Sequence, residues 1–336
     1  MRSEQFIIDK IRSFQAAIFT LAKDDLPSFE KLALAIYNFQ YEVNPIYKSF
    51  VDALPRSMPS CLAEIPFLPI SFFKTHTVLI DGIENESTLF MSSGTTSNER
   101  SKHYVPSLKL YEASFLPTYI NQIGNPEDQL ILALLPSYLE QGNSSLIYMV
   151  NSLIEKSNHP LSGFVLNQAD EIEKRYKTAQ AENKKLILFG VSYALLDLAE
   201  KGLDLSQATI IETGGMKGKR TELTKQELHQ KICDGLNVDF VSSEYGMTEL
   251  LSQAYSKNNG QFSEPPWMKI FIRDVNDPFY YVSQGKTGGI NVIDLANLYS
   301  CCFIATQDLG RIDKAGFSIM GRFDNSDIRG CNLLVQ

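Results

Sequence analysis

Short apolar runs alternate with amphipathic segments between residues 88 and 233 of this chain. The apolar runs have the length of buried strands, and the segments between them repeat apolar residues at helical spacing. Strands that alternate with helices form a mostly parallel sheet covered on both faces, because neighbouring parallel strands are joined by crossovers. The predicted fold class is therefore α/β. The expected strands are residues 88–91, 129–135, 164–166, 185–190 and 208–213, and the expected helices are residues 108–123, 145–156, 171–183, 194–201 and 225–233.

The regions on either side follow other patterns. Residues 3–50 repeat apolar residues at helical spacing, and residues 77–80 have the composition of a strand. From about residue 255 the helical periodicity is lost and short strands are expected. We predict a helical N-terminal region at residues 1–84, an α/β core at residues 85–254, and a small β-rich subdomain at residues 255–336 with strands at 269–273, 280–282, 289–294, 301–305 and 317–320.

The composition limits location and partners. The 336 residues carry a net charge of −8 and no basic run, which argues against a nucleic-acid surface. The first residues lack the basic and then apolar layout of a signal peptide, and the longest apolar run, residues 130–135, is too short to span a bilayer. Five cysteines without a CxxC pair indicate reduced thiols rather than a disulfide frame or a zinc site. We therefore expect a cytoplasmic protein that does not span the membrane.

One loop of the predicted core is rich in hydroxyl groups. Residues 92–97 contain five Ser or Thr and one glycine, Gly94, directly after the expected strand 88–91. Hydroxyls and backbone amides on a loop bent by glycine can surround an anionic oxygen cluster, and Arg100 adds a positive charge where a polyphosphate needs one. Because Ser, Thr and Gly are also common in turns, the loop alone fits a phosphate site and a polar surface loop equally well.

Three later stretches favour the phosphate site. They are residues 244–249 with the sequence Glu-Tyr-Gly-Met-Thr-Glu, residues 306–310 with Thr-Gln-Asp-Leu-Gly, and residues 321–330, which begin with Gly-Arg. Each alone has an ordinary explanation as a turn or a strand end, and Glu249 alone would be a solvated charge. In this order behind the hydroxyl-rich loop, they resemble the motifs of the adenylate-forming enzyme superfamily, which activates carboxylic acids with ATP as acyl-AMP.

The resemblance implies a site for the phosphates of ATP. Ser97 stands where the loop of the superfamily ends in Gly, and Arg100 stands where many relatives have Lys, so the match is close but not complete. Glu249 is implied to hold Mg²⁺, a hard cation that prefers carboxylate oxygen. The residues implied to hold the β- and γ-phosphates lie in the loop and are Ser92, Ser93, Gly94, Thr95, Thr96 and Arg100.

The resemblance also implies a site for the nucleoside. Tyr245 is expected to lie against adenine, and Gly214 and Gly215 to let the backbone approach the nucleotide closely. Asp308 is expected to accept the two ribose hydroxyls, and Arg322 to reach the phosphates or the ribose from a hinge. Thr248 belongs to the same implied nucleotide site.

Within the superfamily, the sequence is most similar to the LuxE acyl-protein synthetase family, the fatty-acid-activating component of the bacterial luminescence reductase. Residues 136–140, 144–149, 213–218 and 327–331 carry this likeness. It implies the N-terminal domain of an adenylate-forming enzyme without the usual C-terminal domain. That domain supplies a lysine for adenylation. Three alternatives follow: the chain adenylates slowly without it, Arg322 or Arg329 substitutes for it, or a partner protein completes the site.

Cys331 lies near the end of the chain, where acyl-protein synthetases of this family carry the acyl group as a thioester. A thiolate attacks acyl-AMP readily because AMP is a good leaving group. The other four cysteines better fit the alternative role of small apolar residues in a core. The expected catalytic residues are therefore Glu249, Arg322 and Cys331, and the expected partner is an acyl reductase or carrier protein that accepts the acyl group.

Other functions stay open at this stage. One is a ligase or acyltransferase similar to phenylacetate–coenzyme A ligases, and another is a non-catalytic subunit of an acyl-reductase or acyltransferase complex. Residues 190–194 imitate the nucleophile elbow of a serine hydrolase but lack its second glycine, and residues 214–221 miss the spacing of a Walker loop. Among the four histidines, expected to be structural, His103 is the most open to a role because it follows the hydroxyl-rich loop.

Overall fold

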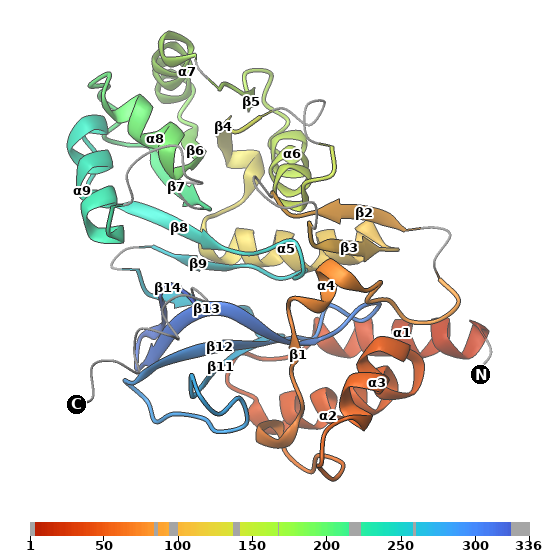
Figure 1. The fold of residues 1–336 in the computed structure, drawn as a ribbon. Helices are drawn as coiled ribbons and strands as arrows, with labels where there is room; N and C mark the ends of the chain where they lie inside the picture. The colour runs from red at the N-terminus through yellow and green to blue at the C-terminus, as the bar shows by residue number, and fades with distance from the viewer. Residues whose placement is uncertain are drawn as a thin grey trace, which may run out of the picture.

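In the computed structural model, a twelve-stranded sheet runs through the molecule, and β2 (Thr88–Met91) and β3 (Lys102–Val105) form a separate hairpin (Figure 1). The structure describes residues 4–83, 87–93, 100–136, 142–166, 168–214, 223–257 and 260–323. The strand order is β11-β12-β13-β14-β10-β9-β8-β7-β6-β4-β5, with β1 beside β13. The part from β8 to β5 is parallel and the path from β8 through β9 to β11 is antiparallel.

The parallel half confirms the predicted α/β pattern. All six residues of β4 are buried, which explains its continuous apolar sequence. The chain moves from β4 outward to β5 and then returns across the sheet to β6, β7 and β8. Because such crossovers are right-handed, the reversal places α6 on one face and α7, α8 and α9 on the other. The elements are α5 (Leu108–Gln122), β4 (Gln129–Leu134), α6 (Ser145–Ser157), β5 (Gly163–Phe164), α7 (Ala169–Ala181), β6 (Lys185–Val191), α8 (Ser192–Ala199), β7 (Thr209–Thr213), α9 (Lys225–Leu236) and β8 (Val241–Tyr245).

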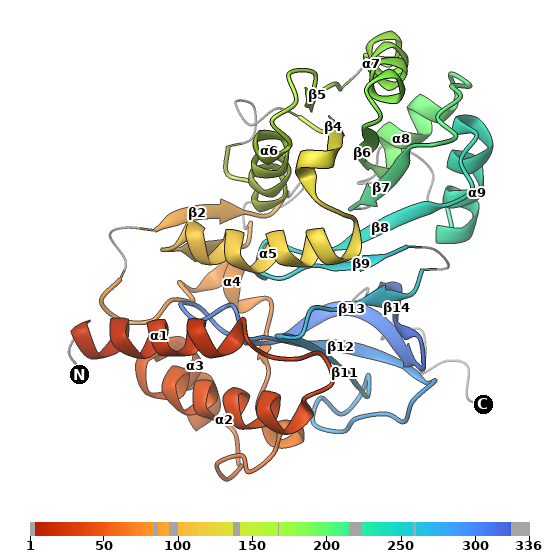
Figure 2. The same ribbon diagram turned by 180° about the vertical axis from the view of Figure 1, so that it is seen from behind.

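The antiparallel half is covered by the N-terminal helices (Figure 2). The ring of Tyr37 in α2 packs edge-on against Phe303 in β13, with centroids 6.2 Å apart. The predicted helices of the N-terminal region are thus present, as α1 (Glu4–Ile18), α2 (Leu26–Val43), α3 (Pro45–Asp52) and the short α4 (Phe72–Thr75). The strands are β1 (Leu68–Pro69), β9 (Ala254–Ser256), β10 (Phe262–Ser263), β11 (Met268–Arg273), β12 (Thr287–Asp294), β13 (Phe303–Asp313) and β14 (Gly316–Arg322), and short 3₁₀ turns lie at Leu62–Glu64 and Pro126–Asp128.

Two predicted strands are not strands in the structure. Residues 77–80 are extended and mostly buried, but they join no ladder, because the Ile80 N–H donates to the carbonyl of Tyr299 in an irregular loop. Residues 280–282 make only an isolated bridge, between Tyr281 and Arg273. Burial accounts for the apolar composition of residues 78–80, whereas Tyr280 is exposed and Tyr281 and Val282 are half-buried.

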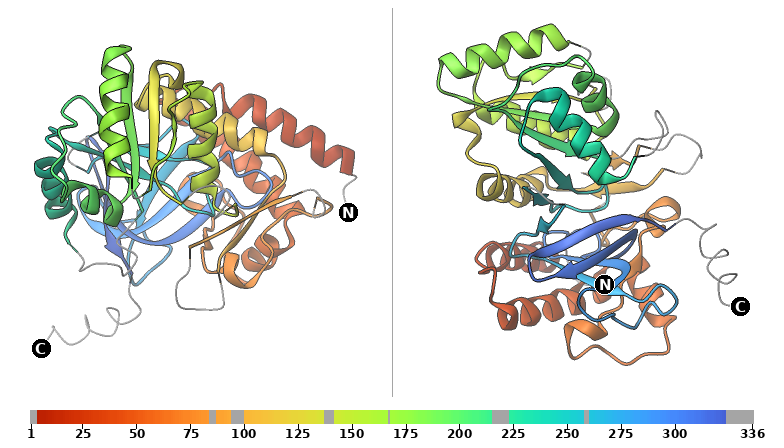
Figure 3. Two further views of the ribbon diagram at one scale, coloured as in Figure 1. Left: turned by 90° about the horizontal axis from the view of Figure 1, so that it is seen from above. Right: turned by 90° about the vertical axis from the view of Figure 1, so that its left-hand side faces the viewer.

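The two halves of the sheet lie one above the other when the molecule is viewed from the side (Figure 3). They are joined through β9, which pairs with β8 on one side and with β10 on the other. The predicted boundary near residue 254 therefore falls at the first residue of a strand in a continuous sheet. Among the described residues, no helix has both the length and the apolar character needed to cross a membrane.

The contact between α8 and α9 gives a test of the packing. A Cβ atom on Gly235 of α9 would overlap the carbonyl group of Ala199, which ends α8. We expect Gly235→Ala to lower the free energy of unfolding by about 2 kcal/mol, because the overlap exceeds the gain in helix propensity. Lys231→Ala on the exposed face of α9 is the control, with an expected change within about 0.5 kcal/mol in urea denaturation. Equal stability of Gly235→Ala and the parent would contradict this close packing.

Candidate active site

The β2–β3 hairpin presents the hydroxyl-rich loop. At its base the Ser92 N–H donates to the Ser101 carbonyl (3.1 Å), and the Ser101 N–H donates to Ser92 Oγ (3.0 Å). Nε of Arg100 donates to the Ser92 carbonyl. Two of the predicted phosphate ligands, Ser92 and Arg100, therefore also close the base of the loop, while Ser93 is exposed beside them.

A second cluster joins three predicted residues that are far apart in sequence. Asp308 in β13 lies opposite Arg322 in β14, and Nε of Arg322 donates to Asp308 Oδ1 (3.1 Å). The Tyr245 hydroxyl at the end of β8 donates to Asp308 Oδ2 (3.0 Å). Burial, and then the nearby Asp308 carboxylate, raise the pKa of Tyr245 well above its ordinary value, so this phenol stays neutral and donates. Asp308 thus lies within a strand, not in the turn that its Asp-Leu-Gly sequence alone would allow.

Glu249 lies between the two groups. It is buried rather than solvated, and burial raises the pKa of its carboxyl above the ordinary value. A hydrogen bond from Ser101 at the base of the loop and the charge of Arg322 oppose this rise, while Asp308 adds to it. Glu249 is therefore hydrogen-bonded to the base of the hydroxyl-rich loop and lies within the electrostatic influence of the Arg322 and Asp308 charges.

The segment that follows β8 is fixed by a residue that the sequence did not single out. Asp294, fully buried at the end of β12, accepts hydrogen bonds from the backbone N–H groups of Leu251 (2.8 Å) and Ser252 (2.9 Å). It also accepts one from the Ser252 hydroxyl (2.6 Å). No motif marks Asp294 in the sequence, because its partners lie more than forty residues away and meet it only through the register of the sheet.

Two acidic residues on neighbouring strands have opposite pKa shifts. Burial alone would raise the pKa of Glu212 in β7, but the nearby His229 ring, the charge and hydrogen bond of Lys225, and the hydrogen bond from Ser192 lower it to about 2. Burial raises the pKa of Glu244 in β8 to about 7, and the adjacent Glu212 carboxylate adds to the rise. Near neutral pH, Glu212 is therefore ionised and Glu244 is partly protonated. Separated values of this kind are common where strands end at ligand sites.

Ser192 does not form the triad that a serine hydrolase needs. Its hydroxyl is buried and donates to Glu212 Oε1 (2.6 Å), with the Gly214 carbonyl oxygen 3.1 Å away. The ring of His229 lies beside Ser243 instead, with Nε2 3.4 Å from Ser243 Oγ. Ser192 therefore fixes the strand end at Gly214, a predicted nucleotide contact.

Several predicted site residues lie outside the part of the chain that the structure describes. The remaining predicted site residues lie at the base of the hydroxyl-rich loop or in and near the Tyr245–Asp308–Arg322 cluster. The exceptions are Gly214, at the end of β7, and Thr248, in the segment after β8. The predicted residues outside the described ranges are Gly94, Thr95, Thr96, Gly215 and Cys331.

The described residues contain no cluster of three or more His, Cys, Asp or Glu side chains that would form a metal cage. Mg²⁺ seldom needs one, because it keeps several waters and takes one or two carboxylates together with substrate phosphates. A single buried carboxylate beside the hydroxyl-rich loop, as Glu249 provides, fits that requirement.

Comparison with known proteins identifies the family. The model of the family described as acyl-protein synthetase, LuxE, matches residues 5–336. The chain belongs to the LuxE acyl-protein synthetase family. A synthetase of this kind is a ligase, which places the chain among enzymes of that class. The long-chain-fatty-acid–luciferin-component ligase of Vibrio harveyi is 24% identical to this LuxE family member over 335 residues, covering 91% of the chain and 86% of that protein.

Solved structures confirm the fold. ATP-bound MatB from Rhodopseudomonas palustris superposes with a TM-score of 0.53 at 17% identity over 70% of the chain and 47% of MatB. A long-chain-fatty-acid–CoA ligase from Archaeoglobus fulgidus gives a TM-score of 0.51 at 15% identity over 72% of the chain and 52% of that protein. The LuxE family member therefore has the adenylate-forming fold and spans about half the length of these two enzymes.

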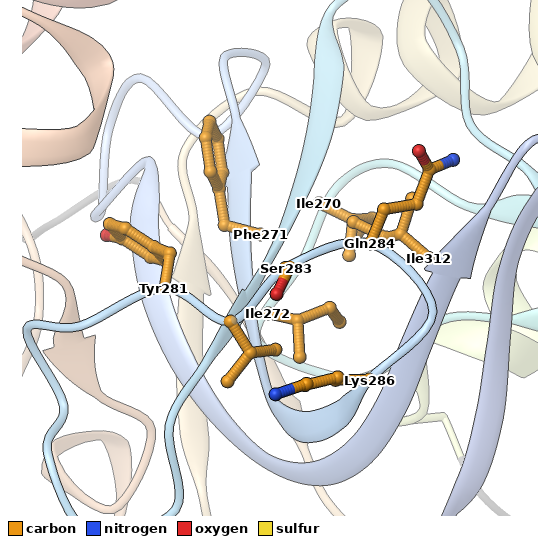
Figure 4. Close-up of a pocket in the computed structure, with 9 residues that line it drawn as sticks. Ile270, Phe271, Ile272, Tyr281, Ser283, Gln284, Lys286 and Ile312 are labelled. Atoms are coloured by element: carbon orange, nitrogen blue, oxygen red, sulfur yellow. The ribbon is translucent and has the colours of Figure 1, made fainter.

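A cavity of about 200 Å³ lies in the antiparallel half (Figure 4). It is lined mainly by β11 and by residues 281–286, with Ile312 of β13. None of the predicted nucleotide or metal residues lines it, so it is separate from the candidate active site.

The raised pKa of Glu244 predicts a pH-dependent stability. At a pH below the ordinary pKa of a glutamate, Glu244 is protonated in both the folded and the unfolded chain. Its carboxyl then does not lower the free energy of unfolding. As the pH rises to about 7, the unfolded chain ionises first, so stability is lost. We expect Glu244→Gln to avoid this loss, and thus to gain about 2 kcal/mol relative to the parent between about pH 5 and about pH 8.

Glu212→Gln is the matched control, and urea denaturation at both pH values is the measurement. The pKa of Glu212 is about 2, so this carboxyl stays ionised across the whole window. Its removal should lower stability at both pH values, and somewhat less at the higher pH, because the Glu212 carboxylate contributes to the raised pKa of Glu244. A Glu244→Gln variant that follows the parent at both pH values would show that Glu244 ionises normally.

Proposed function

We propose that this LuxE family member activates a long-chain fatty acid with ATP as acyl-AMP and transfers the acyl group to the thiol of Cys331. The observation that carries the proposal is the position of Glu249. Its buried carboxylate contacts the base of the hydroxyl-rich loop through Ser101 and lies in the field of Arg322 and Asp308. This arrangement of residues from three motifs that are distant in sequence supports one shared site for a nucleotide and its metal.

The geometry of Asp308 supports ribose binding. A carboxylate has about four acceptor positions. Tyr245 and Arg322 occupy one position on each oxygen, so two positions remain for the two hydroxyls of a ribose. Tyr245 is then fixed with its ring beside the nucleoside, and its packing against Phe317 (5.5 Å between centroids) restrains the ring.

The phosphates would extend from there toward the loop. The proposed phosphate ligands are Ser92 at the base of the loop, Ser93, Gly94, Thr95, Thr96 and Arg100. Glu249 would hold Mg²⁺, which neutralises phosphate charge when bound. The ATP-bound state of MatB, which shares this fold, supports the use of ATP.

The reaction has two steps. A carboxylate oxygen of the fatty acid bonds to the α-phosphorus of ATP, and the bond from that phosphorus to pyrophosphate breaks. The thiolate sulfur of Cys331 then bonds to the acyl carbon, and the bond from this carbon to AMP breaks. The thiol proton leaves to solvent, and the products are pyrophosphate, AMP and a thioester.

The fatty acid and the acceptor are also proposals. The Vibrio harveyi relative is named as a ligase of a long-chain fatty acid, which supports that substrate class for this chain. An acyl reductase or a carrier protein is the proposed recipient of the acyl group from Cys331.

A ligase that uses coenzyme A is the second candidate. The similarity in fold to the Archaeoglobus fulgidus enzyme, which is named as a CoA ligase, supports this second candidate function. Both candidates need the same adenylation residues and differ only in the thiol that receives the acyl group.

Intact-protein mass spectrometry tests the proposal. The parent is incubated with Mg·ATP and a mixture of straight-chain fatty acids, beside Cys331→Ser and Cys233→Ser. We expect an ATP-dependent, hydroxylamine-labile acyl adduct on the parent and on Cys233→Ser, because Cys233 is a partly buried thiol whose pKa is raised by burial. Cys331→Ser should carry no adduct, although it should still exchange pyrophosphate into ATP.

Other outcomes separate the alternatives. No adduct on the parent, together with AMP release that requires coenzyme A, would favour the coenzyme A ligase. Neither an adduct nor AMP release would contradict acyl activation by this chain. An adduct that persists in Cys331→Ser would move the acyl site to another residue.

A further inference from the structure

The segment after β8 that carries Glu249 is also held by hydrogen bonding to β3, the strand that follows the hydroxyl-rich loop. His103 lies in β3 and is 1% exposed. Its Nδ1 is 2.7 Å from the carbonyl oxygen of Thr248, the residue before Glu249. Because a carbonyl can only accept, Nδ1 carries a proton and donates to Thr248.

The other side of the imidazole meets a buried amide. Nε2 of His103 lies 3.1 Å from the side-chain oxygen of Asn297. In a neutral imidazole with its proton on Nδ1, Nε2 cannot donate to this oxygen, so Asn297 acts on the segment through its side-chain nitrogen, which donates to the Glu249 carbonyl (2.8 Å). Asn297 is also 1% exposed. The backbone carbonyl of Asn297 accepts from the buried side chain of Gln40 in α2 (3.0 Å), which holds the main chain at this position. The backbone on both sides of the Thr248–Glu249 peptide is therefore held by side chains from other elements.

His103 and Ser101 act on the same short segment. They are two residues apart along one extended strand and so lie on the same face. Ser101 hydrogen-bonds to the Glu249 side chain, whereas His103 hydrogen-bonds to the backbone just before it. The hydrogen bonds from Ser101 and His103 thus fix both the position and the direction of the Glu249 carboxylate relative to β3.

We propose that His103, together with Asn297, is a positioning residue that holds the Glu249 carboxylate beside Ser101 and thereby sets the affinity for Mg·ATP. The inference rests on the proposed role of Glu249 as the Mg²⁺ ligand. Residues that orient a metal ligand through a hydrogen bond influence metal affinity strongly, typically by about tenfold to a hundredfold. His103 does not touch the reacting atoms, so its effect is on binding geometry and not on proton transfer.

Two conservative substitutions separate the two contacts of the ring. Asparagine places an amide nitrogen close to the position of Nδ1, so His103→Asn keeps a donor for Thr248. Glutamine places its amide nitrogen close to Nε2, so His103→Gln keeps a group facing Asn297 and loses the bond to Thr248. Both are polar and of similar size, which favours folding of both variants. Phe73→Leu is the control for packing, because Phe73 contacts the imidazole edge-on (5.7 Å between centroids) without a hydrogen bond.

The measurement is the rise in melting temperature as Mg²⁺ is titrated at fixed ATP, with ATP plus EDTA as the reference. The KM for Mg·ATP in ATP–pyrophosphate exchange is the second readout. We expect His103→Gln to need about tenfold more Mg²⁺ for the half-maximal shift and to have a correspondingly higher KM. His103→Asn should stay within about threefold of the parent, and Phe73→Leu should melt earlier without a change in Mg²⁺ dependence.

The outcomes distinguish this inference from the proposed function. If the parent itself shows no Mg·ATP-dependent shift, the proposed nucleotide site fails and the positioning role fails with it. If the parent responds and His103→Gln responds at the same Mg²⁺ concentration, the proposed function stands and the positioning role is overturned. Equal weakening in Phe73→Leu and His103→Gln would also overturn it, because packing alone would then explain the effect.

Discussion

Four acidic side chains, Glu212, Glu249, Asp294 and Asp308, are buried where the two halves of the sheet meet the loops. A carboxylate that loses water is costly unless hydrogen bonds or a cation replace the water. Each of the four meets this requirement with different partners, and the partners come from distant parts of the chain. The arrangement of the loops around the site follows from the need to supply these donors.

The partners also divide the four carboxylates by role. Glu212 and Asp294 are surrounded by donors: Lys225, Ser192 and Ser243 for the first, and the backbone of residues 251–252 for the second. They hold the strand ends and the segment after β8 in place. Asp308 and Glu249 have fewer protein donors, since Asp308 receives one on each oxygen, and they can accept more from a ligand. The two groups with spare acceptor capacity are those that the motifs mark as nucleotide and metal ligands.

The site depends on both halves of the sheet. Tyr245 comes from the last parallel strand, whereas Asp308 and Arg322 come from the antiparallel pair β13–β14. The antiparallel path through β9, β10 and β14 brings them within hydrogen-bonding distance. The hairpin β2–β3 adds the loop from outside the sheet, and His103 attaches it to the segment after β8. The nucleotide site that we propose here would be sensitive to any displacement between the two halves of the sheet.

The sequence by itself determined the α/β class, nearly every strand and helix of the parallel half, and the motif residues that were assigned to the nucleotide. Strand and helix periodicity is local, and a motif is a local pattern, so neither needs knowledge of the fold. The strand prediction at residues 77–80 failed because burial in an irregular segment produces the same apolar composition as a strand. Only the tertiary structure decided that Glu249 is buried, that Asp308 faces Arg322 across a ladder, and that His103, Asp294 and Asn297 hold the segment after β8. These features depend on strand register and on contacts between residues far apart in the chain, and no local pattern encodes them.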